Sequence, residues 1–228
     1  MLQQLLSKDF QRKRALAKAS HPVMQEYLSV PLPHRDTLGN VLELVSLDLE
    51  TTGLDPRKDS LLSFGLVNIW HHGIQLKTAW HEIVRIEHDI PESSAVIHHI
   101  TDDLAAEGKP LEILLPKLLQ RLAGKVMLVH YANIEQKFLD AACRELYGSP
   151  FVIQTIDTLN LAQRLLSKRN HSTQSGDLRL FNLRPIFGLP MYKAHNALYD
   201  ALATAELFLA ISRELQPKGK YRLKDFLN

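Results

Sequence analysis

The hydrophobic pattern of residues 44–84 restricts the chain to folds built around a β-sheet that begins with three consecutive strands. In Leu44–Glu50, which reads L-V-S-L-D-L-E, apolar and polar residues alternate with the period of two that is typical of a strand. Two further strand-like runs, Ser60–Trp70 and Ile74–Val84, are joined across His71-His72-Gly73. This arrangement predicts a hairpin or meander.

Beyond residue 100 the pattern changes to alternating helices and strands. Compact apolar strands are predicted at Val126–Val129 and Phe151–Ile156. Helices are predicted at Asp102–Glu107, Pro110–Leu122 with a break or a start at Pro116, Asn133–Tyr147, Thr158–Leu166, Leu178–Phe187 and from about Ala197 to Leu215, with a polar basic loop at Lys168–Gly176. A strand meander followed by helix–strand alternation indicates an α/β domain on a mixed sheet.

The first 40 residues differ from the rest of the 228-residue chain. A basic helical stretch extends to about Ala19, and a connector with two prolines, V-P-L-P-H-R-D-T-L-G-N, follows it. Residues 1–40 carry six Lys and Arg against three Asp and Glu, whereas residues 41–228 carry 21 against 22. We therefore expect a basic helical extension and linker over residues 1–40 and one domain over residues 41–228, although the net charge is only +2.

Composition excludes several classes of protein. With 45% hydrophobic and 23% charged residues, the chain is neither mainly disordered nor a coiled coil. Cys143 is the only cysteine, which excludes an internal disulfide and a cysteine-based zinc site. No apolar run approaches the ~18 residues of a membrane span, and the amino terminus does not read as a signal peptide. We expect a cytoplasmic protein.

Asp48 and Glu50 are the first candidate site residues. They lie two positions apart on a predicted strand, so both carboxylates leave the same face of the sheet. Paired hard oxygen ligands suit Mg²⁺ or Mn²⁺, although a polar strand edge would show the same pattern. The Thr51-Thr52-Gly53 turn that follows would expose backbone N–H groups, beside which a phosphate or a terminal sugar could approach.

Glu135 is the second candidate. It shares a helical stripe with Phe138, Leu139 and Ala142, and a carboxylate on an apolar stripe needs a partner. Its place in the first helical turn also permits a simpler role as a capping acid.

His195 and Asp200 form the third candidate pair. On one continuous helix their side chains would diverge by about 140°. They converge if His195 lies in the loop before the helix and Asp200 lies in its second turn. A histidine that titrates near neutrality can accept a proton from a metal-bound water.

Five segments together resemble the DEDDh 3′–5′ exonucleases, the group that contains the epsilon subunit of bacterial DNA polymerase III, RNase T and oligoribonuclease. S-L-D-L-E-T-T-G-L-D-P resembles the first motif of that family, V-H-Y-A-N-I-E-Q-K-F-L the second, and A-H-N-A-L-Y-D-A-L-A-T-A-E-L-F the third. A-V-I-H-H-I-T-D-D-L resembles the His-Gly-Ile-Thr segment, with His99 in place of Gly, and T-I-D-T-L-N-L-A resembles the Asp-Thr strand end. The resemblance covers roughly residues 43–212 in the family's order.

The resemblance implies an RNase H-like five-stranded mixed sheet flanked by helices, and a phosphodiesterase that uses two divalent metal ions, Mg²⁺ or Mn²⁺. It implies that Asp48, Glu50 and Asp200 bind the metals, that Glu135 completes the ligand shell of the second metal ion, and that His195 is the general base, so activity should rise with pH. The residues implied to hold the terminal nucleotide are Thr51, Thr52, Leu54, His98 and Thr101. The product would be a nucleoside 5′-monophosphate.

One residue departs from the family pattern. Five residues after His130 the family has an Asp, where this chain has Glu135. The additional methylene moves the carboxylate oxygens on the order of 1.5 Å outward, and about 1 Å of misplacement can cost a hundredfold in rate. A catalytically weak nucleic-acid-binding or polymerase-binding module is therefore an alternative.

The expected partner is the 3′ end of single-stranded nucleic acid. DNA is favoured over RNA because oligoribonucleases lack a basic amino-terminal extension of this kind, and an RNA-trimming enzyme is the rival interpretation. Basic residues of the amino terminus, the Lys168–Arg179 loop and the Lys218–Lys224 tail are candidates for contact with the phosphate backbone. Association with a DNA polymerase or other repair protein and a homodimer remain open, and no membrane partner is expected.

Overall fold

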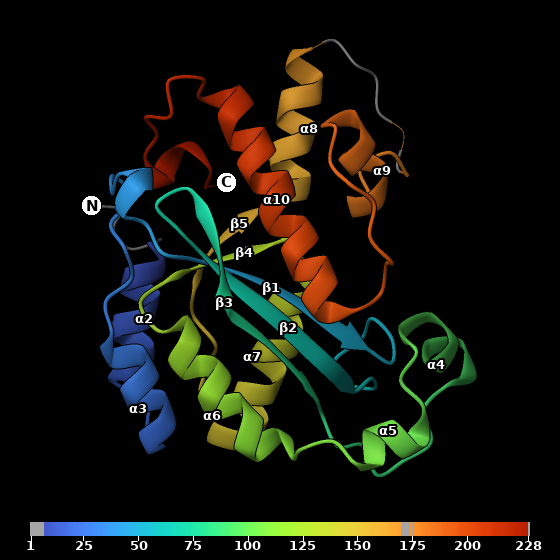
Figure 1. Ribbon diagram of the computed structural model, residues 1–228. Coiled ribbons are helices and arrows are strands. Elements are labelled where there is room, and N and C mark those ends of the chain that lie inside the picture. The colour runs from blue at the N-terminus through green and yellow to red at the C-terminus, as the bar shows by residue number, and fades with distance from the viewer. Residues whose placement is uncertain (1–6, 170–173, 175, 228) are drawn as a thin grey trace.

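A mixed sheet of five strands forms the centre of the computed structural model, which describes residues 7–169, 174 and 176–227 (Figure 1). The strands are β1 (Leu44–Thr51), β2 (Leu61–Trp70), β3 (Gly73–Ile83), β4 (Val126–Val129) and β5 (Gln154–Asp157), in the spatial order β3-β2-β1-β4-β5. The first three strands pair antiparallel, β4 runs parallel to β1, and β5 runs parallel to β4. This topology confirms the predicted α/β fold class.

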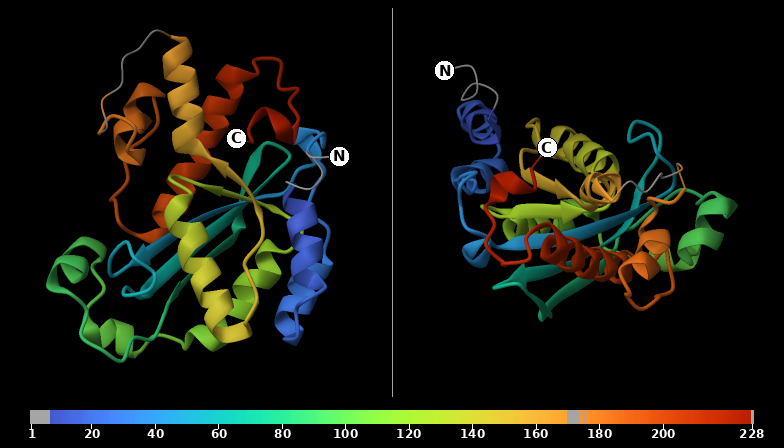
Figure 2. Two further views of the ribbon diagram at one scale, coloured as in Figure 1. Left: turned by 180° about the vertical axis from the view of Figure 1, so that it is seen from behind. Right: turned by 90° about the horizontal axis from the view of Figure 1, so that it is seen from above.

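Helices cover both faces of the sheet (Figures 1 and 2). They are α2 (Lys8–Leu16), α3 (Pro22–Ser29), α4 (Glu92–His98), α5 (Asp102–Ala106), α6 (Leu111–Leu122), α7 (Asn133–Tyr147), α8 (Thr158–Lys168), α9 (Leu180–Ile186) and α10 (Ala197–Leu215), with 3₁₀ turns η1 (Gly39–Val41) and η2 (Leu223–Asp225). Buried side chains of α6 and α7 pack with Leu47 and Val129 on one face. Those of α8, α9 and α10 pack with Leu128 and Ile156 on the other.

The amino-terminal segment contains two helices where the sequence predicted one. The first ends at Leu16 rather than near Ala19, and α3 starts at the His21-Pro22 step, which lies between the predicted helical stretch and the predicted connector. Proline is favourable at the first position of a helix because that position has no intrahelical N–H partner. His21 Nδ1 accepts the Val23 N–H at 3.3 Å and so caps α3.

Three other features of the secondary structure differ from the prediction. Helix α4 was not predicted, because its seven residues are too few to show a clear period. Strand β5 begins three residues later than expected, and helix α6 continues through Pro116 without a break. Residues 170–173 and 175 of the predicted basic loop lie outside the described part of the chain.

The residues before β1 pack against the domain. Ala15, Met24, Tyr27 and Leu28 are buried in the same apolar cluster as α6 and α7. The segment that follows α3 runs beside the carboxy-terminal tail, where the Gly39 N–H donates to the carbonyl of Tyr221 at 2.8 Å. The division of the chain at residue 40 stays a prediction. Among the described residues, no helix has the length and apolar character needed to cross a membrane.

Candidate active site

Strand β1 positions Asp48 and Glu50 at the centre of the sheet. Their side chains leave the face covered by α10, as the neighbouring Ser46 shows by donating its hydroxyl to the carbonyl of Ala201 at 2.7 Å. The strand pairs with β2 along its whole length and with β4 over residues 44–46, so its backbone is held in the sheet. The two carboxylates therefore lie under the first turns of α10.

A glycine on β2 allows α10 to come this close. Gly65 pairs with Asp48 in the sheet. A Cβ at Gly65 would stand 2.2 Å from the backbone nitrogen of Leu198 and 2.3 Å from the carbonyl carbon of Ala197. Only glycine leaves room for the first turn of α10 to rest on the strand.

This close approach brings Asp200 to the strand carboxylates. One carboxylate oxygen each from Asp48, Glu50 and Asp200 lies within 4.8 Å of the others. Asp200 is in the first turn of α10 rather than the predicted second. The three carboxylates form a cluster of hard oxygen donors of the kind that holds Mg²⁺ or Mn²⁺.

His195 occupies the loop directly before α10, the position that convergence with Asp200 required. Its φ of 65° is in the left-handed region, and its backbone N–H donates to Asp200 Oδ2 at 3.0 Å. Asn196 caps the helix by accepting the Tyr199 N–H at 3.2 Å. The loop therefore turns back toward the carboxylates before the helix begins.

Glu135 approaches the cluster from the first turn of α7, where its side chain is 3% exposed. The turn that leads into α7 is fixed by Asp157, whose carboxylate accepts the N–H groups of Tyr131 and Ala132, each at 3.0 Å. Asp157 also caps α8 by accepting the Leu159 N–H at 3.0 Å. This aspartate belongs to the T-I-D-T segment, and it joins β5 to the start of α7.

Burial and mutual repulsion raise the pKa values of the clustered carboxyls. The pKa of Asp48 is raised well above its ordinary value by burial and by the charges of Glu50, Asp200 and Glu135. Burial also raises the pKa of Glu135 to about 8 and that of Asp200 to about 7, with Glu50 contributing to both. The His195 N–H opposes the shift at Asp200 because it stabilises the carboxylate.

The donor set fits divalent metal ions. Within the described residues, Glu50 Oε1, Glu135 Oε2 and Asp200 Oδ1 are buried without a hydrogen-bond partner. A buried oxygen of this kind is costly unless a cation satisfies it. Oxygen ligands on this pattern suit Mg²⁺ or Mn²⁺ better than softer metals.

A second group of side chains lies beside the carboxylates. His98 Nδ1 lies 2.5 Å from Glu50 Oε2. The ring of His98 packs edge-on against that of His195, with centroids 5.8 Å apart. A cavity of about 250 Å³ opens next to them. The residues that line it are Glu50, Ser63, His81, Ile83, His98, His99, Ile100, Lys193, Ala194, His195, Asn196 and Tyr199.

His99 ends α4 in the left-handed conformation, with a φ of 56°. Glycine adopts this conformation at low cost, which explains why the resembling segment has Gly at the position of His99. In this chain the position adds an imidazole to the cavity lining.

The other nucleotide-binding candidates, Thr51, Thr52, Leu54 and Thr101, are not among the described residues that line the cavity. Thr51 Oγ1 donates to the carbonyl of Gly53 at 2.6 Å, and Thr52 Oγ1 accepts the Ser60 N–H at 2.8 Å. Both hydroxyls therefore stabilise the turn after β1. Leu54, on the same turn, is 74% exposed. Thr101 caps α5 through its hydroxyl.

Comparison with known proteins identifies the family. A family model described as an exonuclease, RNase_T, matches residues 45–208. The chain belongs to this exonuclease family. The match confirms the predicted membership of the DEDDh 3′–5′ exonucleases and of the RNase H-like superfamily, and it confirms the prediction of a hydrolase.

Relatives of this chain include much longer polymerases. The chain is 32% identical over 181 residues to the PolC-type DNA polymerase III of Thermotoga maritima, a match that covers 79% of this chain and 13% of the polymerase. The PolC-type enzyme of Staphylococcus epidermidis is 25% identical over 192 residues, which cover 83% of this chain and 13% of that enzyme. The chain therefore spans only a small part of the length of these relatives.

Solved structures show the same fold. Escherichia coli exonuclease I, in complex with a dA16 oligonucleotide, has a TM-score of 0.67 and 16% identity, covering 78% of this chain and 42% of that one. The nuclease domain of 3′hExo, a DEDDh family member bound to rAMP, has a TM-score of 0.65 and 16% identity, covering 77% of this chain and 94% of that one.

Arg184 is a buried charged residue near the site that the sequence did not single out. Its fully buried guanidinium donates to the carbonyl of Pro190 at 2.5 and 2.8 Å, to that of Ala203 at 2.9 Å, and to Glu206 Oε2 at 2.6 Å. It also lies over the ring of Tyr192, 4.6 Å from its centroid. These contacts join α9 to α10 and hold the loop that carries His195.

The sequence carried a partial signal for Arg184. A charged residue within the apolar stretch L-F-N-L-R-P-I needs a partner if the stretch is buried. Glu206 belongs to the third motif, but it lies 22 residues away, so only the packing of α9 on α10 reveals that the two residues meet. Gly65 gave no comparable signal, because its role depends on how closely α10 approaches.

Proposed function

We propose that this domain is a 3′–5′ exonuclease that hydrolyses phosphodiester bonds at the 3′ ends of single-stranded DNA and releases nucleoside 5′-monophosphates. The observation that carries the proposal is the cluster of Asp48, Glu50 and Asp200, whose oxygens lie within 4.8 Å of one another. Glu135 extends the cluster. One buried carboxylate oxygen each of Glu50, Glu135 and Asp200 lacks a hydrogen-bond partner among the described residues.

Asp48, Glu50 and Asp200 would hold two divalent ions, Mg²⁺ or Mn²⁺, with Glu135 completing the second site. When bound, the ions neutralise charge on the reacting phosphate and acidify the attacking water. Without cations the same carboxylates repel one another and would repel the phosphate backbone. The proposed activity therefore requires a divalent metal ion.

His195 is the proposed general base. The backbone hydrogen bond to Asp200 holds the residue beside the cluster, and its side chain is exposed. One ring nitrogen lies within 4.8 Å of a Glu50 oxygen and of a His98 nitrogen. From this position the imidazole can take the proton that the attacking water releases. Arg184 acts through the loop as a positioning residue.

Thr51, Thr52, Leu54, His98 and Thr101 are proposed to surround the terminal nucleotide. The hydroxyls of Thr51 and Thr52 fix the turn after β1, and Leu54 offers an exposed apolar surface to a base or sugar. His98 lines the cavity from α4 and contacts Glu50. The 3′ end would therefore lie between the β1 turn and the α4–α5 segment.

The relatives support DNA as the substrate. The PolC-type proteins are DNA polymerases by name, and exonuclease I was solved with a DNA oligonucleotide. They also support association with a DNA polymerase, since the matching segment belongs to one in the PolC-type relatives. The adenosine monophosphate in the 3′hExo structure is a ribonucleotide, which favours RNA as the second candidate substrate.

A single assay tests the function. The protein is incubated with 5′-labelled single-stranded DNA or RNA in Mg²⁺, Mn²⁺ or EDTA, beside the variants Asp48→Ala and His195→Gln. We expect metal-dependent shortening from the 3′ end of DNA, abolished by Asp48→Ala and reduced on the order of a hundredfold or more by His195→Gln. Faster shortening of RNA would establish the second candidate. No shortening of either polymer with any metal would refute the proposal in favour of a binding module.

A further inference from the structure

A second hollow, of about 680 Å³, lies between α2 and α7 and is strongly basic. Five cationic side chains line it, and all are exposed: Lys8, Arg14, Lys18, Lys137 and Arg144. The lining contains one carboxylate, Asp140. Residues 148–153 form its floor between the two helices. We refer to this hollow as the α2–α7 groove.

Most of the positive charge in the groove is not neutralised by the described part of the chain. Arg144 is paired with Asp140 at 2.7 Å. Among the described residues, no carboxylate lies within ion-pair distance of Lys8, Arg14, Lys18 or Lys137. Like charges gathered in one hollow attract a polyanion and concentrate it there.

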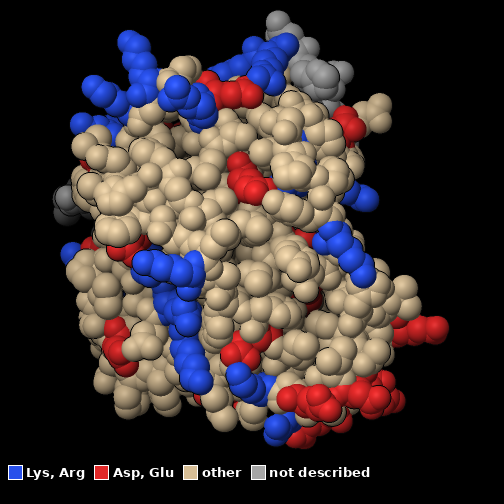
Figure 3. Space-filling model, in the orientation of Figure 1, with Lys and Arg blue, Asp and Glu red and all other residues tan. Residues whose placement is uncertain are grey.

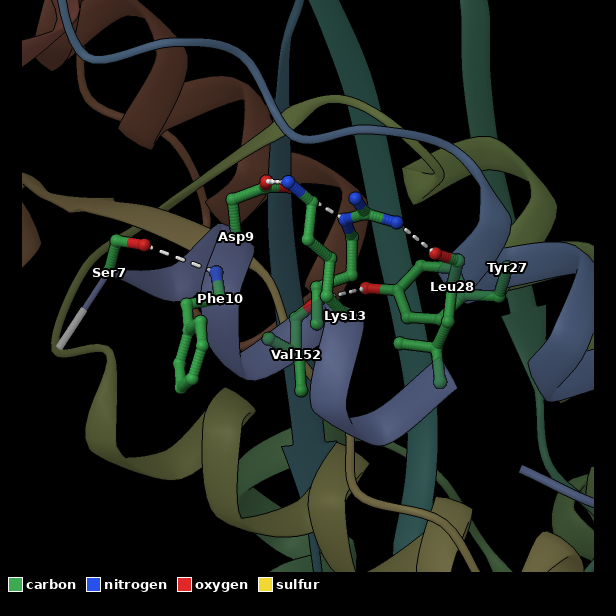
Figure 4. A network of polar contacts seen from close by, with 8 residues as sticks. Ser7, Asp9, Phe10, Lys13, Tyr27, Leu28 and Val152 are labelled. Atoms are coloured by element: carbon green, nitrogen blue, oxygen red, sulfur yellow. Dashed lines mark hydrogen bonds and ion pairs between the residues drawn. The ribbon is translucent and has the colours of Figure 1, made fainter. Parts of the chain in front are cut away.

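The groove is preformed, because α2 is fixed to the domain (Figure 4). Buried Arg12 donates to Asp9 Oδ1 at 2.7 Å and to the carbonyl of Leu28, which joins α2 to α3. Tyr27 then donates its hydroxyl to the carbonyl of Val152 at 2.9 Å, which joins α3 to the groove floor. A rigid wall does not have to be ordered when a ligand binds.

Helix α7 connects the groove to the carboxylate cluster. Its first turn carries Glu135 inward, while Asn133, Gln136 and Lys137 face the groove from the same turns. Fifteen residues give the helix a length of about 22 Å. A strand that crosses the start of α7 would therefore enter the basic groove directly.

The opposite side of the site is acidic and disfavours a phosphate backbone. Acidic side chains gather over α5 in Figure 3. The exposed carboxylates of this region are Glu87, Asp89, Glu92, Asp102, Asp103 and Glu107. The charge asymmetry directs a polyanion toward α7 and away from α5.

We propose that the α2–α7 groove binds the phosphate backbone of the substrate strand on the 5′ side of the 3′ end that enters the active site. The proposal rests on the proposed function for its link to catalysis. It assigns a role to the basic residues of the amino-terminal helix, which lies outside the segment matched by the exonuclease family.

The test compares two variants that each lose three positive charges. The groove variant combines Arg14→Ala, Lys18→Ala and Lys137→Ala. The control variant combines Arg213→Ala, Lys77→Ala and Lys117→Ala, whose parent residues are also exposed but lie outside the groove lining. Thermal unfolding of both variants verifies that they are folded.

Binding is measured by fluorescence polarisation with a 5′-fluorescein oligothymidylate of about 20 nucleotides in EDTA, across a salt series. For a single strand, the loss of three phosphate contacts reduces the magnitude of the slope of log K against log salt by about 2. At ~0.1 M salt, this change raises Kd by at most about a hundredfold. We expect the groove variant to bind tenfold to a hundredfold more weakly than the parent. The control variant should stay near the parent.

A groove variant that binds as tightly as the parent, or a control variant weakened equally, would overturn the proposal. The second arm measures shortening of the same oligonucleotide and of a trinucleotide in Mn²⁺. The ratio of kcat/KM for the long oligonucleotide to kcat/KM for the trinucleotide should fall in the groove variant by a similar factor. An unchanged ratio would show that the groove does not bind the strand that is being shortened, and would overturn the proposal. If the parent shortens neither, the proposed function fails, and the polarisation result alone decides whether the groove binds nucleic acid.

Discussion

Replacing Glu135 by Gln should stabilise the metal-free protein, and increasingly so as the pH rises. The pKa of Glu135 is raised from 4.5 to about 8, first by burial and then by the neighbouring charges of Asp157 and Glu50. The folded state therefore retains a proton that the unfolded chain releases above its own pKa. Stability falls as the pH rises from the unfolded pKa to the folded one, and it levels off above the folded value.

The magnitude follows from linkage. A shift of 3.5 units, from 4.5 to 8, corresponds to about 5 kcal/mol once the carboxyl is fully ionised in both states. The cost is about 1 kcal/mol at pH 5 and about 4 kcal/mol at pH 8. Gln does not titrate, so the variant's advantage in free energy of unfolding should grow by about 3 kcal/mol between these pH values.

The assay is urea unfolding in EDTA at pH 5, 6, 7 and 8. Glu145→Gln is the matched control, because Glu145 lies on the same helix and is exposed. A difference between Glu135→Gln and the parent that is independent of pH, or that shrinks as the pH rises, would refute the reasoning. Adding Mn²⁺ should raise the Tm of the parent more than that of the variant, since a bound cation removes the repulsion that Gln removes in its absence.

Three further substitutions test how the site is built. Gly65→Ala places a Cβ 2.2 Å from the Leu198 nitrogen, so we expect a loss of about 2–3 kcal/mol in urea unfolding and a fall in kcat/KM of about a hundredfold; parent-like values of both would contradict the close approach of α10. Arg184→Lys keeps the charge but loses the planar guanidinium, which should lower the free energy of unfolding by about 3 kcal/mol and also lower kcat. An unchanged kcat in the folded variant would show that Arg184 does not position the His195 loop. Glu135→Asp should match or exceed the parent in Mg²⁺-dependent shortening, and loss of activity would show that the site is adapted to Glu.

Much of the fold followed from local sequence patterns. The alternation in Leu44–Glu50 predicted β1, and the long helix Asn133–Tyr147 was predicted to the residue. Long elements with a clear period are predictable because each repeats the same burial pattern many times. The seven-residue α4 and the eight-residue α3 were missed, since short helices are stabilised mainly by what they pack against.

Part of the candidate site was also predictable. The two-residue spacing on a strand placed Asp48 and Glu50 on one face, and the family motifs supplied Glu135, His195 and Asp200. Their grouping required contacts between elements far apart in the chain. Ser46 meets Ala201 across 155 residues, and Tyr131 meets Asp157 across 26.

The sequence by itself determined the long strands and helices, the candidate site residues, and the family that the chain resembles, because these depend on residue type and short spacing. The tertiary structure decided how near those side chains come to one another. The absence of a side chain at Gly65 lets α10 reach the sheet, and the buried fork of Arg184 holds the His195 loop. The raised pKa of Glu135 and the unpaired cations of the α2–α7 groove arise only after packing, because burial and charge proximity are properties of the folded chain.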